Sequence, residues 1–133
     1  MHLIFCIDNQ DGLSFLRRRL SRDREVSAHI LRISEGYPLW TSPDSAALFP
    51  KGTVIADPDF LQKASCGDYC FVEMPLTADA VHGLESVILY HWNRNYPSTE
   101  KLSRDLLAEM SLTHTEEFPG NSHDKITMER YTL

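Results

Sequence analysis

The segment Leu3-Ile4-Phe5-Cys6-Ile7-Asp8 decides the fold class, because five consecutive apolar residues run directly into a carboxylate. Three similar short runs follow it along the chain: Thr53 to Ala56, Tyr69 to Met74, and Val87 to Trp92. Near-continuous apolar runs without strict alternation are typical of strands buried on both faces, as in parallel sheets covered by helices. The sequence therefore predicts a mostly parallel sheet built from these runs.

Helix signals lie between and after the predicted strands. Ser42-Pro43 predicts a short helix that Pro50 ends, since serine favours the N-cap and proline the first helical position. Asp57-Pro58 offers the same start to a helix over Asp59 to Ala64. Ser98 opens a longer predicted helix, whose apolar face consists of Leu102, Leu106, Leu107 and Met110.

The segment from Asp11 to Ser34 carries an apolar stripe that changes face. At about 100° per residue, one side of a helix would hold Leu13, Leu16 and Leu20, whereas another side would hold Val26, Ile30 and Ile33. One straight helix fits this pattern poorly. We therefore predict a break at Ser21-Arg22-Asp23, with Ser21 as the N-cap of a helix that reaches about Ser34 and is ended by Gly36.

The carboxyl-terminal part of the chain predicts a hairpin. The segments Ser111 to Phe118 and Lys125 to Leu133 flank the turn-forming cluster Pro119-Gly120-Asn121-Ser122. A length of 133 residues suits one domain and is too short for two well-cored ones. The predicted architecture is therefore one layered α/β/α domain over residues 1–133, with a mostly parallel sheet and a C-terminal antiparallel hairpin.

Composition and charge narrow the class of protein. Apolar residues make up 42% and charged residues 24%, as in ordinary globular proteins. The net charge of −6 argues against wrapping a nucleic-acid backbone. No secretion signal or membrane-spanning run is visible, so we expect a cytoplasmic protein that does not bind membranes. Too few ligands surround Cys66 and Cys70 for a closed zinc site.

Several catalytic and nucleotide-binding motifs are missing. The six scattered glycines supply neither G-x-x-x-x-G-K-[ST] nor G-x-G-x-x-G, which cradle phosphates in the common nucleotide folds. The chain also lacks G-x-S-x-G and H-E-x-x-H, the motifs of serine hydrolases and zinc proteases. No motif therefore specifies a reaction.

Carboxylates cluster at the predicted carboxyl edge of the sheet, where ligands bind in open α/β folds. Asp8 ends the first strand, Asp11 follows shortly after, and Glu73 lies near the end of the third run. Oxygen ligands of this kind bind Mg²⁺ in nucleases and phosphatases. These three residues are the candidate catalytic groups, and Asp8 and Glu73 are weak metal candidates. Asp57 is explained better as a helix N-cap.

Five of the basic residues fall within Arg17-Arg18-Arg19-Leu20-Ser21-Arg22-Asp23-Arg24. Guanidinium groups bind phosphate in bidentate fashion, and a helix that starts after Ser21 would add backbone N–H donors. Arg18, Arg19, Ser21 and Arg22 are therefore candidate ligand-binding residues. A solvated helix face with surface ion pairs is the competing interpretation.

Polar and aromatic residues after the last predicted strands complete the candidate ligand site: Asn9, Trp92, Arg94, His123 and Lys125. Trp92 and Arg94 can line a pocket or cover the end of the sheet. His123 and Lys125 lie in a turn that is hydrophilic for any function. Ser122-His123-Asp124 is no catalytic triad, because triads are assembled in space and adjacent side chains point apart.

Several stretches resemble a small family of bacterial proteins of nearly the same length, mainly from clostridia and their relatives: Arg18 to Arg24, Phe60 to Ala64, Gly67 to Glu73, Trp92 to Ser98, and Ser122 to Thr127. Some members carry a ribonuclease Z label. That enzyme needs an H-x-H-x-D-H cluster, which this chain lacks. The resemblance therefore implies no activity.

Three functional hypotheses result. The leading one is a small protein that binds a phosphate-bearing molecule through Arg18, Arg19, Arg22 and Arg94 at the carboxyl edge of the sheet. The second is a Mg²⁺-dependent nuclease or phosphohydrolase that uses Asp8, Asp11 and Glu73. The third is an interaction module without catalysis that forms a homodimer through the terminal hairpin. No cofactor is expected apart from Mg²⁺, and nucleic acid is not an expected partner.

Overall fold

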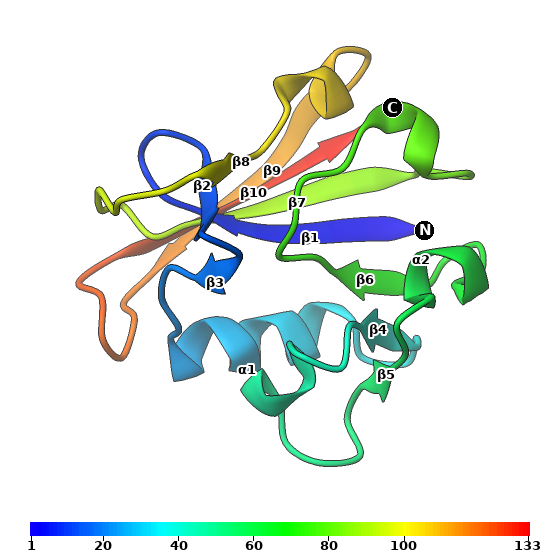
Figure 1. The fold of residues 1–133 in the computed structure, drawn as a ribbon, viewed down its shortest axis with the longest axis horizontal. Coiled ribbons are helices and arrows are strands. Elements are labelled where there is room, and N and C mark those ends of the chain that lie inside the picture. Colours follow the sequence, from blue (N-terminus) through cyan, green and yellow to red (C-terminus); the bar gives the residue numbers. More distant parts are fainter.

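The computed structural model describes residues 1–133 and contains a seven-stranded sheet (Figure 1). The strand order is β5-β4-β6-β1-β7-β10-β9. The strands span Ile55–Ala56 (β5), Leu39–Thr41 (β4), Tyr69–Phe71 (β6), His2–Ile7 (β1), Ser86–His91 (β7), Ile126–Thr132 (β10) and Ser111–Phe118 (β9). The first five are parallel, whereas β10 is antiparallel to both β7 and β9.

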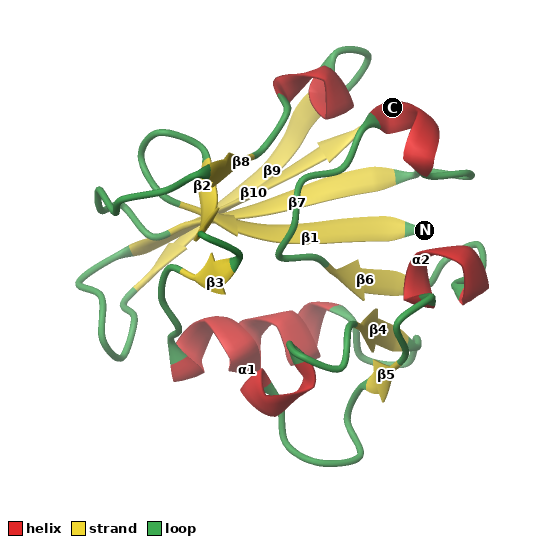
Figure 2. Cartoon of the chain, viewed as in Figure 1, coloured by secondary structure: helices red, strands yellow, loops and turns green.

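A second, antiparallel sheet has the order β3-β2-β8 and is formed by Gly12–Phe15 (β2), Arg18–Arg19 (β3) and Glu100–Lys101 (β8). Few helices accompany the two sheets (Figure 2). The α-helices are Arg24–Ile33 (α1) and Phe60–Lys63 (α2), and the 3₁₀ turns are Ala46–Leu48, Ala78–Ala80 and Arg104–Leu107. None of these helices is both long and apolar enough to cross a lipid bilayer.

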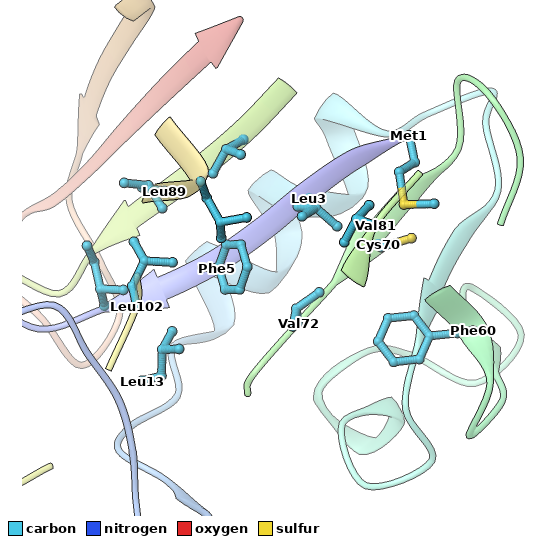
Figure 3. Close-up of a cluster of buried hydrophobic side chains, with 13 residues drawn as sticks. Met1, Leu3, Phe5, Leu13, Phe60, Cys70, Val72, Val81, Leu89 and Leu102 are labelled. Atoms are coloured by element: carbon cyan, nitrogen blue, oxygen red, sulfur yellow. The ribbon is translucent and has the colours of Figure 1, made fainter. Parts of the chain in front are cut away.

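Strand β1 lies at the centre of two hydrophobic clusters, because successive side chains of a strand point to opposite faces. Leu3, Phe5 and Ile7 belong to the cluster that Figure 3 shows, together with Phe60, Val81, Leu102 and Leu106. Ile4 belongs to the other cluster, which contains Val26 and Ile30 of α1. The sheet therefore has buried apolar side chains on both faces, as its continuous apolar runs predict.

The predicted fold class is confirmed: the chain is a single α/β domain with a mostly parallel sheet and an antiparallel C-terminal hairpin. The hairpin strands match the predicted segments closely. Leu39–Thr41 was not predicted as a strand, because three residues are too short for a periodic pattern. The helices predicted after Ser42, Asp57 and Ser98 are reduced to single turns or 3₁₀ turns.

The structure corrects the segment before α1. Residues 12–19 form the β2–β3 hairpin instead of a helix, and α1 begins at Arg24 with Asp23, not Ser21, as its N-cap. Leu16 and Arg17 occupy the tight turn in the left-handed region, with φ of 48° and 65°. The helical spacing of the leucines was therefore fortuitous, since Leu13 is buried while Leu16 is 67% exposed.

Candidate functional site

A cleft of about 370 Å³ opens at the carboxyl ends of β4 and β6, beside the β2–β3 hairpin. Its apolar lining comes from α2, the end of β6 and the loop that follows β6: Phe60, Leu61, Phe71, Val72, Met74 and Leu76. Its polar lining comes from the hairpin, the segment after β4 and the loop after β6: Ser14, Arg17, Arg18, Arg19, Ser42, Asp44, Ser45 and Glu73. Such a mixture of apolar walls and a few polar groups is typical of a small-molecule site.

An ion pair between Arg19 and Glu73 joins the hairpin to the loop after β6 inside the cleft. Arg19 donates from Nε to Glu73 Oε2 and from Nη2 to Oε1, both at 2.7 Å. Ser45 Oγ donates to the same carboxylate at 2.6 Å. These hydrogen bonds with Glu73 raise the pKa of Arg19 above its usual value. The bidentate geometry leaves little of the Arg19 guanidinium for a ligand.

The hairpin turn places two further arginines in the wall of the cleft. The backbone N–H of Leu16 donates to Thr99 Oγ1, and that of Arg17 donates to Glu100 Oε1, each at 2.7 Å. These contacts hold Leu16 and Arg17 in the left-handed region, a backbone conformation that is unfavourable for residues other than glycine. The guanidinium groups of Arg17 and Arg18 make no hydrogen bond or ion pair with the protein, so both remain free to bind an anion.

The other predicted carboxylates lie away from Glu73 and have protein partners of their own. Asp8 accepts backbone hydrogen bonds from Gln10, Gly12 and Tyr96 at 2.9, 2.6 and 3.0 Å. Burial raises the pKa of Asp8, but these donors outweigh it and leave the pKa lowered. Asp11 forms a bidentate pair with Arg104 at 2.9 and 2.6 Å. No three acidic, histidine or cysteine side chains converge as metal ligands.

A second polar cluster, the latch, connects the start of α1 to the β9–β10 turn and comprises Asp23, His123, Tyr96, Ser21 and Ser122. Asp23 Oδ2 lies 2.9 Å from His123 Nδ1 and accepts a hydrogen bond from the Ser122 N–H at 2.8 Å. His123 Nε2 lies 2.9 Å from Tyr96 Oη and 3.2 Å from Ser21 Oγ. The side chains of Asp23 and His123 are 0% and 1% exposed.

The latch reproduces the order of a serine–histidine–aspartate relay but lacks room for a substrate. The cavity beside Ser21 measures only about 10 Å³, which is no larger than a single water requires. His123 also stacks on Trp92, with ring centroids 4.6 Å apart, and shares its Nε2 with Tyr96. The latch therefore holds the fold together.

The remaining candidate residues do not join the cleft. Arg94 donates to the Ser122 carbonyl at 3.0 Å, and its own carbonyl accepts from the Asn9 N–H at 2.9 Å. Lys125 lies 3.5 Å from Glu117. Arg22 is exposed near the latch. Of the sequence-predicted residues, the cleft thus brings together only Arg18, Arg19 and Glu73.

Most residues that line the cleft were not among the sequence-predicted site residues, and they include Arg17, Ser14, Ser45 and Phe60. No local signal distinguishes the two serines from ordinary loop or strand residues. Phe60 is the buried residue of α2, but its position in the wall of a cleft depends on the neighbouring hairpin.

No family model matches the chain, and no curated protein matches it. Among solved structures, the chain is similar to a dihydrofolate reductase from Enterococcus faecalis that was solved in complex with NADP(H) and RAB-propyl. The sequence identity is 7% and the TM-score is 0.66, and the match covers 98% of this chain and 94% of that chain. The chain therefore has the α/β fold of dihydrofolate reductase.

This similarity contradicts the functions expected from the sequence. The predicted binding of a phosphate-bearing molecule is wrong, and its arginines are dispersed: Arg19 is paired with Glu73, while Arg22 and Arg94 lie outside the cleft. The alternative of a Mg²⁺-dependent nuclease or phosphohydrolase falls with it, whereas the homodimeric interaction module stays a prediction. For the nuclease, the physical reason is that the candidate carboxylates are separated and bound to protein donors.

Proposed function

We propose that the protein binds a folate-like small molecule in the cleft, with a fused heteroaromatic ring against the apolar wall and a carboxylate at Arg17 and Arg18. The observation that carries this proposal is the meeting of an apolar wall with two unpaired guanidinium groups. The name of the similar structure, a dihydrofolate reductase, supports a ligand of this class.

The apolar wall suits a flat ring. Phe60, Phe71 and Val72 are all buried residues that line the cleft, and aromatic side chains favour offset or edge contacts with another ring. The volume of about 370 Å³ lies at the lower end of the range for drug-sized ligands, about 300–1,000 Å³. The cleft has room for one such ligand, so we propose ligand binding and no reaction between two bound substrates.

The free arginines suit a carboxylate. Arg17 and Arg18 follow one another across the hairpin turn, and a guanidinium binds a carboxylate with two parallel hydrogen bonds. Because Arg19 is paired with Glu73, the free positive charges of the cleft are those of Arg17 and Arg18, which outnumber the one remaining carboxylate, Asp44. An acidic protein with this local positive charge selects anions at one place on its surface.

Isothermal titration calorimetry with folate and dihydrofolate tests the proposal. We expect saturable binding, weakened about tenfold by the double variant Arg17→Ala/Arg18→Ala, because hydrogen bonds to charged groups contribute about 1.5 kcal/mol or more. Arg22→Ala is the control, since it removes one positive charge from a position outside the cleft. Absence of binding at millimolar folate, or equal weakening by Arg22→Ala, would overturn the proposal.

A further inference from the structure

One buried hydroxyl in the cleft lacks a partner. Ser14 is 1% exposed, and its Oγ is the only buried side-chain nitrogen or oxygen atom in the chain that makes no hydrogen bond. The hydroxyls of Thr99 and Ser14 both lower the pKa of the nearby Glu100 carboxyl, but Ser14 Oγ has no hydrogen bond of normal distance and angle to that carboxylate. Buried polar groups in folded proteins are almost always paired, so an unpaired one calls for an explanation.

The fold itself does not need this hydroxyl. Ser14 sits in β2 between β3 and β8, where it pairs with Arg19 and Glu100, and its carbonyl accepts from the Thr99 N–H at 2.9 Å. The neighbouring Leu13 supplies the apolar side chain that enters the core. Alanine at position 14 would satisfy the same backbone pairing, so the strand contacts of β2 do not require the hydroxyl.

The position of the hydroxyl points to a ligand. Ser14 lines the same cleft as Phe71 and Val72, whereas the free charges lie on the exposed Arg17 and Arg18. A ligand site usually fixes its ligand with a few polar groups placed in an apolar wall. The hydroxyl of Ser14 can both donate and accept a hydrogen bond, so it can pair with a ring nitrogen or an exocyclic oxygen.

We infer that Ser14 determines the specificity of the cleft by hydrogen bonding to the buried edge of the ligand ring. The inference rests on the proposed function and sharpens it. The ligand must be a heteroaromatic acid with a polar ring edge, and an aromatic acid with a purely hydrocarbon ring must bind more weakly. The preference arises because a polar ring edge gives the buried hydroxyl the hydrogen-bond partner that it lacks, whereas a hydrocarbon ring gives it none.

A pair of bicyclic acids tests this inference by calorimetry: pterin-6-carboxylate, whose ring edge is polar, and 2-naphthoate, whose ring is hydrocarbon. We expect the wild-type protein to prefer pterin-6-carboxylate by about tenfold or more. Ser14→Ala should remove most of this preference by weakening the pterin alone. The same substitution should leave the melting temperature unchanged or raise it, because it deletes an unpaired buried group.

Ser45→Ala is the matched control. Ser45 is also a buried serine of the cleft, but its Oγ already donates to Glu73 at 2.6 Å. We expect this variant to lower the melting temperature and to retain the preference for pterin-6-carboxylate. A preference that survives Ser14→Ala, or wild-type protein that binds both acids equally, would overturn the inference while the proposed function stands. Wild-type protein that binds neither acid nor folate would overturn both.

Discussion

The latch and the cleft show two opposite uses of polar residues near the carboxyl edge of one sheet. In the latch, the Asp23 carboxylate accepts from three backbone N–H groups and two side chains, and the adjoining cavity is water-sized. In the cleft, two guanidinium groups and the Ser14 hydroxyl remain unpaired beside about 370 Å³ of open space. Saturated polar groups stabilise the fold, whereas unsaturated ones are available to a ligand.

Removing the carboxylate of the latch should have the largest effect. We expect Asp23→Ala to reduce the free energy of unfolding by about 3–5 kcal/mol, because it leaves buried donors of the turn unpaired and removes the N-cap of α1. Urea unfolding followed by circular dichroism measures this loss. A loss below about 1 kcal/mol, the size of a surface ion pair, would show that the latch is not a stabilising cluster.

Acid should weaken the latch. Burial raises the pKa of Asp23, but hydrogen bonds from Asn121, His123, Ser122 and Glu25 outweigh it and lower the pKa well below 3.8. Because the folded-state pKa is depressed, this stabilisation is present above the unfolded pKa and is lost as the pH falls through the folded value. We expect the free energy of unfolding to fall below about pH 4.

Asp23→Asn makes this pH prediction specific. The asparagine variant cannot titrate at that position, so its free energy of unfolding should depend less steeply on pH between about 4 and 2 than that of the wild type. Denaturant titrations at a series of pH values give both slopes. Equal slopes would assign the acid sensitivity to other carboxylates, such as Asp8, whose pKa is also lowered.

Breaking the ion pair of the cleft should have a smaller effect on stability and a visible effect on binding. Glu73→Gln frees the guanidinium of Arg19 while glutamine retains a hydrogen-bond acceptor for Ser45. We expect a loss of about 1 kcal/mol in stability, since both side chains are partly exposed. Folate should bind several-fold more tightly because a third cation becomes available. Weaker folate binding would instead make Glu73 itself a ligand contact.

The sequence predicts the elements that local patterns determine and misses those that depend on contacts between distant residues. Near-continuous apolar runs and a turn cluster are local patterns, so the sheet around Leu3–Ile7 and the terminal hairpin were predictable. The β2–β3 hairpin was not, because its turn uses Leu16 and Arg17 in the left-handed region and is held by Thr99 and Glu100 from far along the chain.

The candidate site was only partly predictable for the same reason. Arg18, Arg19 and Glu73 stand out by charge and position, and the cleft includes all three. The roles of Asp8 and His123 depend on distant backbone and side-chain partners that no local pattern shows. Nothing in the sequence distinguishes Ser14 from other strand serines, because only the folded structure shows that its hydroxyl is buried without a partner.

Amide chemical-shift mapping during a folate titration tests the contrast between cleft and latch most directly. We expect saturable shifts for the amides of Ser14, Arg18 and Glu73, with those of Asn121 and His123 unchanged. Shifts centred on Asn121 and His123, with Ser14 and Glu73 unmoved, would contradict this expectation, because they would place the ligand site at the latch.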